Sequence, residues 1–76
     1  MALVKKLEEK VIDHPSLHGE TTATFTIITN EDGRKLLQID TYGSDTRKIP
    51  GKISQSLQFG PEGIQALKAI LEKFKE

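Results

Sequence analysis

An Asp-Gly turn between two stretches of strand-forming residues is the feature that most constrains the fold of this chain. Thr21–Thr29 (TTATFTIIT) is dense in β-branched and aromatic residues, and Arg34–Tyr42 (RKLLQIDTY) forms a second stretch that favours a strand. Asn30–Gly33 (NEDG) lies between them, and Asp-Gly supplies the positive φ that a tight hairpin turn requires. We therefore predict an antiparallel hairpin over residues 21–42.

A third strand and a helix are predicted after the hairpin. Gly43–Gly51 (GSDTRKIPG) is a polar loop with a Pro-Gly turn signal, and Lys52–Phe59 (KISQSLQF) then alternates between apolar and polar residues. Gly60-Pro61-Glu62 favours a helix start, because proline is common at the first helical position and glutamate suits the positive end of the dipole. The helix is predicted over residues 61–75, with one apolar stripe. This stripe consists of Ile64, Leu67, Ile70, Leu71 and Phe74.

The first thirteen residues leave two alternatives open. Apolar residues between positions 3 and 11 follow helical spacing, but Pro15 disfavours helix at His14 and so limits its length. A first strand around Glu8–Ile12 is the competing interpretation. In either case we expect residues 1–76 to form one α+β domain, in which an antiparallel β meander of three or four strands (21–59) carries a C-terminal amphipathic helix on one face.

The alternation along the strands predicts a sheet with two chemically different faces. The face under the helix is expected to hold Ala23, Phe25, Ile27, Leu37, Ile39, Ile53, Leu57 and Phe59. The open face is expected to hold Thr22, Thr24, Thr26, Gln38, Tyr42, Lys52, Ser54, Ser56 and Gln58. A function located on the sheet is therefore expected on its polar, open face.

The small size of the chain predicts self-association. A chain of 76 residues has a marginal core, and natural domains of this size often add a disulfide, a metal or a partner chain. The sequence has no cysteine, which excludes disulfides and thiolate zinc sites, so a homodimer is expected. No apolar run reaches the ~20 residues of a membrane span, and the N-terminus lacks the apolar region of a secretory signal. We expect a soluble, cytoplasmic protein.

No site for metal or catalysis is predicted. Asp13-His14 with His18 and Glu20 contains metal-ligand residue types, but Pro15 opposes the helix that would place both histidines on one face, so a polar loop is favoured. No nucleophile–base arrangement is legible, and one sheet with one helix rarely forms a concave, water-excluding pocket. We predict no enzyme activity and no cofactor.

The charge of the chain is balanced in sum but sorted along the sequence. Residues 1–32 contain three basic and six acidic residues, whereas residues 33–59 contain five basic and two acidic residues. The basic residues of the second segment, together with Tyr42, match the cations and stacking aromatics of single-strand binders. The simpler interpretation is that these cations protect the sheet edges from pairing with other chains. They are Arg34, Lys35, Arg47, Lys48 and Lys52.

From Leu36 to Phe74 the chain resembles the single-stranded-DNA-binding domain of the transcriptional coactivator family known as positive cofactor four. The matching motifs are Leu37-Gln38-Ile39-Asp40, Ile49-Pro50-Gly51-Lys52, Ile53-Ser54-Gln55-Ser56-Leu57, Gly60-Pro61-Glu62 and Leu67-Lys68. The resemblance implies antiparallel strands followed by one helix, dimerisation largely through the helices, and a curved sheet that holds single strands. It points to Lys52, and more loosely to Arg47 and Lys48, as DNA contacts.

The resulting hypothesis is a homodimeric protein that binds single-stranded nucleic acid, with DNA favoured. Phosphates would lie against the five cations, a base would stack on Tyr42, and hydrogen bonds would come from Gln38, Ser54 and Ser56. The rival hypothesis is a protein-interaction module, such as a small inhibitor or adaptor of bacterial or phage type, that binds no nucleic acid. Salt separates them, because phosphate binding weakens log-linearly with salt.

Overall fold

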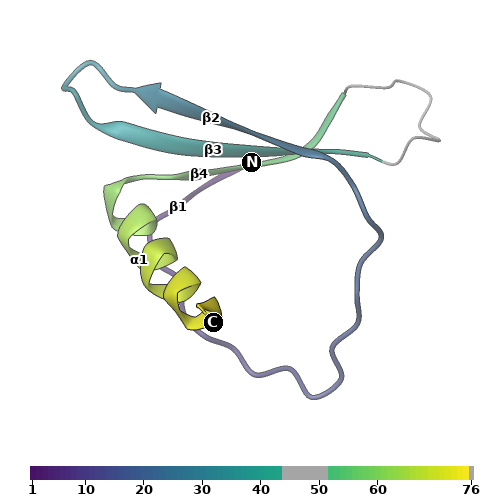
Figure 1. Cartoon of the computed structure of the whole chain (residues 1–76). Helices are drawn as coiled ribbons and strands as arrows, with labels where there is room; N and C mark the ends of the chain where they lie inside the picture. Colours follow the sequence, from purple (N-terminus) through teal and green to yellow (C-terminus); the bar gives the residue numbers. More distant parts are fainter. Residues whose placement is uncertain (44–51, 76) are drawn as a thin grey trace.

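The computed structural model describes residues 1–43 and 52–75, which form one four-stranded sheet and one C-terminal helix (Figure 1). The predicted α+β class is confirmed. The predicted loop Gly43–Gly51, with Arg47 and Lys48, lies outside the described residues except for Gly43. The elements are β1 (Ala2–Val4), β2 (Ala23–Thr29), β3 (Lys35–Tyr42), β4 (Ile53–Phe59), α1 (Pro61–Leu71) and the short 3-10 helix η1 (Glu72–Phe74).

The strand order is β1-β4-β3-β2, and the sheet is mixed. β2, β3 and β4 pair antiparallel, as the predicted meander requires, but β1 pairs parallel with β4. A first strand forms within residues 1–13, as one of the two alternatives expected, but it lies at Ala2–Val4 and not around Glu8–Ile12, and residues 5–22 contain neither helix nor strand. Val4 instead completes the sheet opposite Phe59.

The β2–β3 hairpin forms as predicted. Gly33 has a φ of 84°, a conformation that glycine adopts without steric cost. The amide of Gly33 donates to the carbonyl of Asn30 (3.0 Å), and the amide of Asn30 donates to the carbonyl of Arg34 (2.7 Å). The Asp32 carboxylate accepts from the amide of Arg34 (3.1 Å), so side-chain and main-chain bonds together fix this turn.

The register confirms two faces of different composition, since directly opposed residues lie on the same face of a sheet. Phe25 lies opposite Ile39, and Ile39 opposite Leu57. We call this the apolar face, and it holds Ala23, Phe25, Ile27, Leu37, Ile39, Leu57 and Phe59. On the polar face, register and alternation place Thr24, Thr26, Gln38, Asp40, Tyr42, Ser56 and Gln58.

Helix α1 packs over only one end of the apolar face. Pro61 starts the helix and Glu62 lies in its first turn, as predicted. Gly63 is buried against Phe59, which at 6% exposure is the one buried hydrophobic side chain of the described residues. Phe25 and Ile27 remain 71% and 61% exposed. The expectation of a covered face therefore holds near β4 and fails near β2, because α1 packs against β3 and β4 and leaves β2 open.

A long segment without regular structure, residues 5–22, connects β1 to β2. Figure 1 shows it passing the C-terminal end of α1 and then curving back to the sheet as a wide arc. Leu7, Glu8 and Glu9 border the helix, where Lys73 forms a 3.4 Å ion pair with Glu9. All of these residues are exposed, including Leu17. We refer to this segment as the arm.

Candidate nucleic-acid interface

A continuous hydrogen-bond network crosses the polar face from β4 to β3. Gln58 donates its Nε2 to Oε1 of Gln38 at 2.9 Å. Gln38 in turn donates its Nε2 to both carboxylate oxygens of Asp40 at 3.1 Å. Ser56 donates its hydroxyl to Oδ1 of Asp40 at 2.6 Å. We call the series Gln58–Gln38–Asp40 the amide relay.

Asp40 anchors this network at the centre of the sheet. It lies opposite Thr24 on β2 and Ser56 on β4, and it is 6% exposed. A buried carboxylate requires hydrogen bonds, and no buried side-chain polar atom of the described residues lacks a partner. Gln38 and Ser56 were predicted site residues, whereas Asp40 and Gln58 were not. Asp40 alternates with Gln38 and Tyr42 along β3, and this spacing was the available signal.

Tyr42 marks the other end of the polar face. Its hydroxyl lies 2.9 Å from the hydroxyl of Thr24 on the neighbouring strand. Its main chain forms two hydrogen bonds with the end of the arm. The amide of Tyr42 donates to the carbonyl of Thr22 (3.2 Å), and its carbonyl accepts from the hydroxyl of Thr21. The ring is half-buried, so Tyr42 is a positioned aromatic side chain on the polar face.

The predicted cations do not gather on one surface. Arg34 lies at the hairpin end, where its Nε pairs with Asp32 at 3.2 Å. Lys35 lies opposite Thr29 and alternates with Leu37, which places it on the apolar face. Lys52 is exposed and directly precedes β4. Ser54 is also exposed, two residues before Ser56 on the same strand. Arg47 and Lys48 lie outside the described residues.

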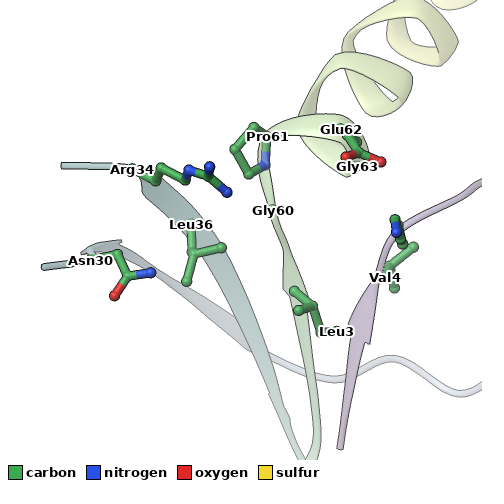
Figure 2. Close-up of a pocket in the computed structure, with 10 residues that line it drawn as sticks. Leu3, Val4, Asn30, Arg34, Leu36, Gly60, Pro61, Glu62 and Gly63 are labelled. Carbon is green, nitrogen blue, oxygen red and sulfur yellow. The ribbon is translucent and has the colours of Figure 1, made fainter. Parts of the chain in front are cut away.

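Two hollows lie at the β1 side of the sheet. A groove of about 300 Å³ is lined by Met1, Ala2 and Leu3 on one side and by Gln38, Ser56 and Gln58 on the other. A cavity of about 440 Å³ lies at the start of α1, where Leu3, Leu36 and Pro61 form apolar walls and Arg34 reaches across (Figure 2). Lys5 and Glu62 also border this cavity, so its charge is mixed.

The described residues contain no cluster of three or more metal-ligand side chains. Within the same residues, no helix has the length and apolar character needed to cross a membrane. Comparisons with protein-family models, curated proteins and solved structures found no match to this chain. Function must therefore be inferred from the two faces of the sheet.

Proposed function

We propose that the chain is a homodimeric, non-enzymatic protein of the cytoplasm that binds single-stranded nucleic acid, with DNA favoured, on its polar face. The observation that carries this proposal is the sheet itself, whose polar face and whose apolar face beyond the helix are both open in one protomer. The apolar face suits a second copy of the chain, and the polar face suits the bases of a single strand.

The surface area of the protomer supports a dimer. The protomer exposes 7095 Å², whereas a compact monomer of 8.5 kDa exposes about 4,700 Å². The radius of gyration is 14.8 Å, against about 11 Å for a compact domain of this length. The excess of roughly 2,400 Å² per chain is enough for an obligate homodimer, whose interfaces bury about 2,000–5,000 Å² in total.

The exposed apolar side chains indicate where the second copy packs. Phe25 and Ile27 on β2 and Leu57 on β4 are 71%, 61% and 42% exposed. On the helix, Leu71 and Phe74 are 58% and 75% exposed. Ile64, Leu67 and Ile70 of the predicted stripe are half-buried within the protomer. In a twofold dimer the same patch of one protomer packs against the same patch of the other. Each of these side chains would therefore be buried in both protomers.

The polar face supplies the groups that a single strand needs. Tyr42 offers a ring for stacking, and base stacking on aromatic side chains tolerates any sequence. Gln38 and Ser56 hold fixed positions in the hydrogen-bond network, and the exposed Ser54 lies where the register between β4 and β3 shifts. Arg34 and Lys52 lie at strand ends, where phosphates on either side of the bases would meet them. Arg47 and Lys48 add two positive charges in the sequence between β3 and β4.

The binding test is fluorescence anisotropy of a labelled single strand, with a duplex control, across a salt series. We expect preference for the single strand and a log-linear loss of affinity with salt. Lys52→Ala should reduce the salt slope by about 0.7, the value for one phosphate contact on a single strand. Lys35→Ala removes the same charge from the apolar face and is the matched control; its slope should stay that of the wild type.

Absence of binding at low salt would refute the nucleic-acid proposal. The polar face would then be assigned to a protein partner, as in an inhibitor or adaptor, and a partner would be sought by pull-down. Equal slopes for Lys52→Ala and Lys35→Ala would contradict the assignment of a phosphate contact to Lys52.

The dimer test is the molar mass in solution, measured by light scattering after size exclusion. We expect the mass of two chains for the wild type and a shift to one chain for Phe25→Asp, because burial of each phenylalanine contributes about 1.5–3 kcal/mol. Thr26→Asp places the same charge on the polar face of the same strand and should leave the mass unchanged. A wild-type mass of one chain would refute the dimer.

A further inference from the structure

The amide relay has a fixed direction. A carboxylate side chain only accepts hydrogen bonds, so Gln38 must present its Nε2 to Asp40 and its Oε1 to Gln58. Gln58 must then donate its Nε2 to Gln38. The orientation of both amides therefore follows from the one acidic residue, and Oε1 of Gln58 is the group at the far end of the relay.

This end of the relay borders the groove of about 300 Å³ beside β1. One wall of the groove is apolar and consists of Met1, Ala2 and Leu3, and the other holds Gln38, Ser56 and Gln58. A nucleobase has the same combination of an apolar ring face and a polar edge. The groove therefore suits one base with its edge toward the relay.

The polarity of the relay selects the edge. Oε1 of Gln58, a residue that lines the groove, accepts no hydrogen bond from the described residues. Free acceptors suit a base that carries an amino group, and a carboxylate disfavours the like-charged phosphate. Cytosine presents an N4 amino group, whereas uracil and thymine present a carbonyl oxygen at the same position.

From this arrangement we infer a specificity for the proposed single-strand site, and the inference rests on that proposed function. The groove takes one base by its amino-bearing edge, and the relay makes the site prefer cytosine to uracil or thymine. Cytosine donates from N4 to Oε1 of Gln58. Uracil would oppose its own carbonyl to that oxygen, which leaves both acceptors without a donor.

The test is competition of unlabelled oligo(dC), oligo(dU) and oligo(dT) of equal length against a labelled mixed-sequence single strand at pH 7.5. Oligo(dU) removes the methyl group of thymine from the comparison, so dC and dU differ only in the hydrogen-bonding edge. We expect dC to compete about threefold to tenfold better than dU, the range that one net hydrogen bond contributes, and dT to behave like dU.

Two variants test the relay directly. Asp40→Asn can donate from its amide, which lets Gln38 and Gln58 both turn over and present Nε2 of Gln58 to the groove. The dC/dU ratio should then fall to one or invert. Gln58→Leu removes the end group while leaving Asp40 paired, and it should abolish the ratio even if Asp40→Asn does not fold. Gln55→Leu is the control, because Gln55 is exposed and lies opposite Thr41 on the other face.

The outcomes distinguish failure of this inference from failure of the proposed single-strand binding. Single-strand binding with equal dC and dU affinities in the wild type overturns the inference and leaves the proposed function in place. A dC preference that survives Gln58→Leu also overturns it, because the preference then comes from stacking. If the protein binds neither the labelled strand nor any of the oligonucleotides, both the inference and the proposed function are overturned.

Discussion

Replacing Gly63 with alanine tests the packing of the helix on the sheet. Gly63 is buried in the first turn of α1, where the helix passes over the junction of β1 and β4. A Cβ atom at this position would lie 2.7 Å from the carbonyl oxygen of Val4 and 3.4 Å from the Cβ and Cδ2 atoms of Phe59. The first contact is with main chain, so no side-chain rotation relieves it.

The magnitude follows from two opposing effects. An additional methyl group in a packed site costs about 1–3 kcal/mol, and a main-chain neighbour at 2.7 Å favours the upper half of that range. The higher helix propensity of alanine than of glycine stabilises the helix by about 1 kcal/mol. We therefore expect Gly63→Ala to lower the free energy of unfolding by about 1–2 kcal/mol. For a domain of this size, each kcal/mol shifts Tm by about 4–8 °C.

The assay is thermal unfolding followed by circular dichroism at one fixed chain concentration, because the stability of the proposed dimer would depend on concentration. Lys68→Ala, at an exposed position of the same helix, is the control for the general effect of alanine and should move Tm little. A Tm for Gly63→Ala at or above that of the wild type would refute the reasoning. It would mean that α1 does not approach β1 as closely as the contact with Val4 requires.

Three further substitutions follow from local geometry. Gly60 occupies the N-cap of α1 with extended backbone and no side-chain cap, and a Cβ there meets only Cδ2 of Leu36 at 3.5 Å. Gly60→Ser should raise the free energy of unfolding by about 0.5–1 kcal/mol, and a lower Tm in thermal unfolding would contradict this. Ser56→Ala removes the donor to Asp40 and should cost about 1–3 kcal/mol in chemical denaturation; an unchanged midpoint would show that the bond contributes nothing. Lys73→Ala removes an ion pair with Glu9 in which both side chains are mostly exposed, so its effect in the same assay should stay below about 0.5 kcal/mol, whereas a loss above 1 kcal/mol would indicate that the arm depends on this pair.

The elements with strong local signals were predictable from the sequence. The hairpin depends on Gly33 and its neighbours, and the predicted turn is the observed one. Apolar and polar residues alternate along β2, β3 and β4, and this alternation predicted that Phe25 and Ile27 share a face with the apolar residues of β3 and β4. The helix start at Pro61 was also predicted, since first-turn residues act locally. Only the last turn differs, because it tightens into the 3-10 helix Glu72–Phe74.

The elements that depend on long-range pairing were not predictable. β1 is three residues long and gains its hydrogen bonds from β4, more than fifty residues away in the chain. No periodicity in so short a strand reveals such a partner. The apolar spacing that suggested a helix continues into the arm, where Leu7 borders α1. The arm carries other apolar residues that remain exposed, such as Val11.

The candidate site was predicted in part. Gln38 and Ser56 lie together on the polar face as expected, and Tyr42 lies on the same face. Asp40 was not predicted as a site residue, although its hydrogen bonds organise the face. Its position between Thr24 and Ser56 follows from the register and not from composition. Lys35 was expected beside the other cations, and strand alternation places it on the opposite face.

Sedimentation of a labelled single strand with the wild-type protein, at low salt and in the presence of excess unlabelled duplex, tests the central claim most directly. The account predicts that the strand sediments with the mass of two chains plus one oligonucleotide. It also predicts that Phe25→Asp and Lys52→Ala weaken the complex, the first by dissociating the dimer and the second by removing a phosphate contact. A strand that sediments alone at every protein concentration, or a complex that excess duplex removes, would contradict the assignment of the polar face to single-stranded nucleic acid.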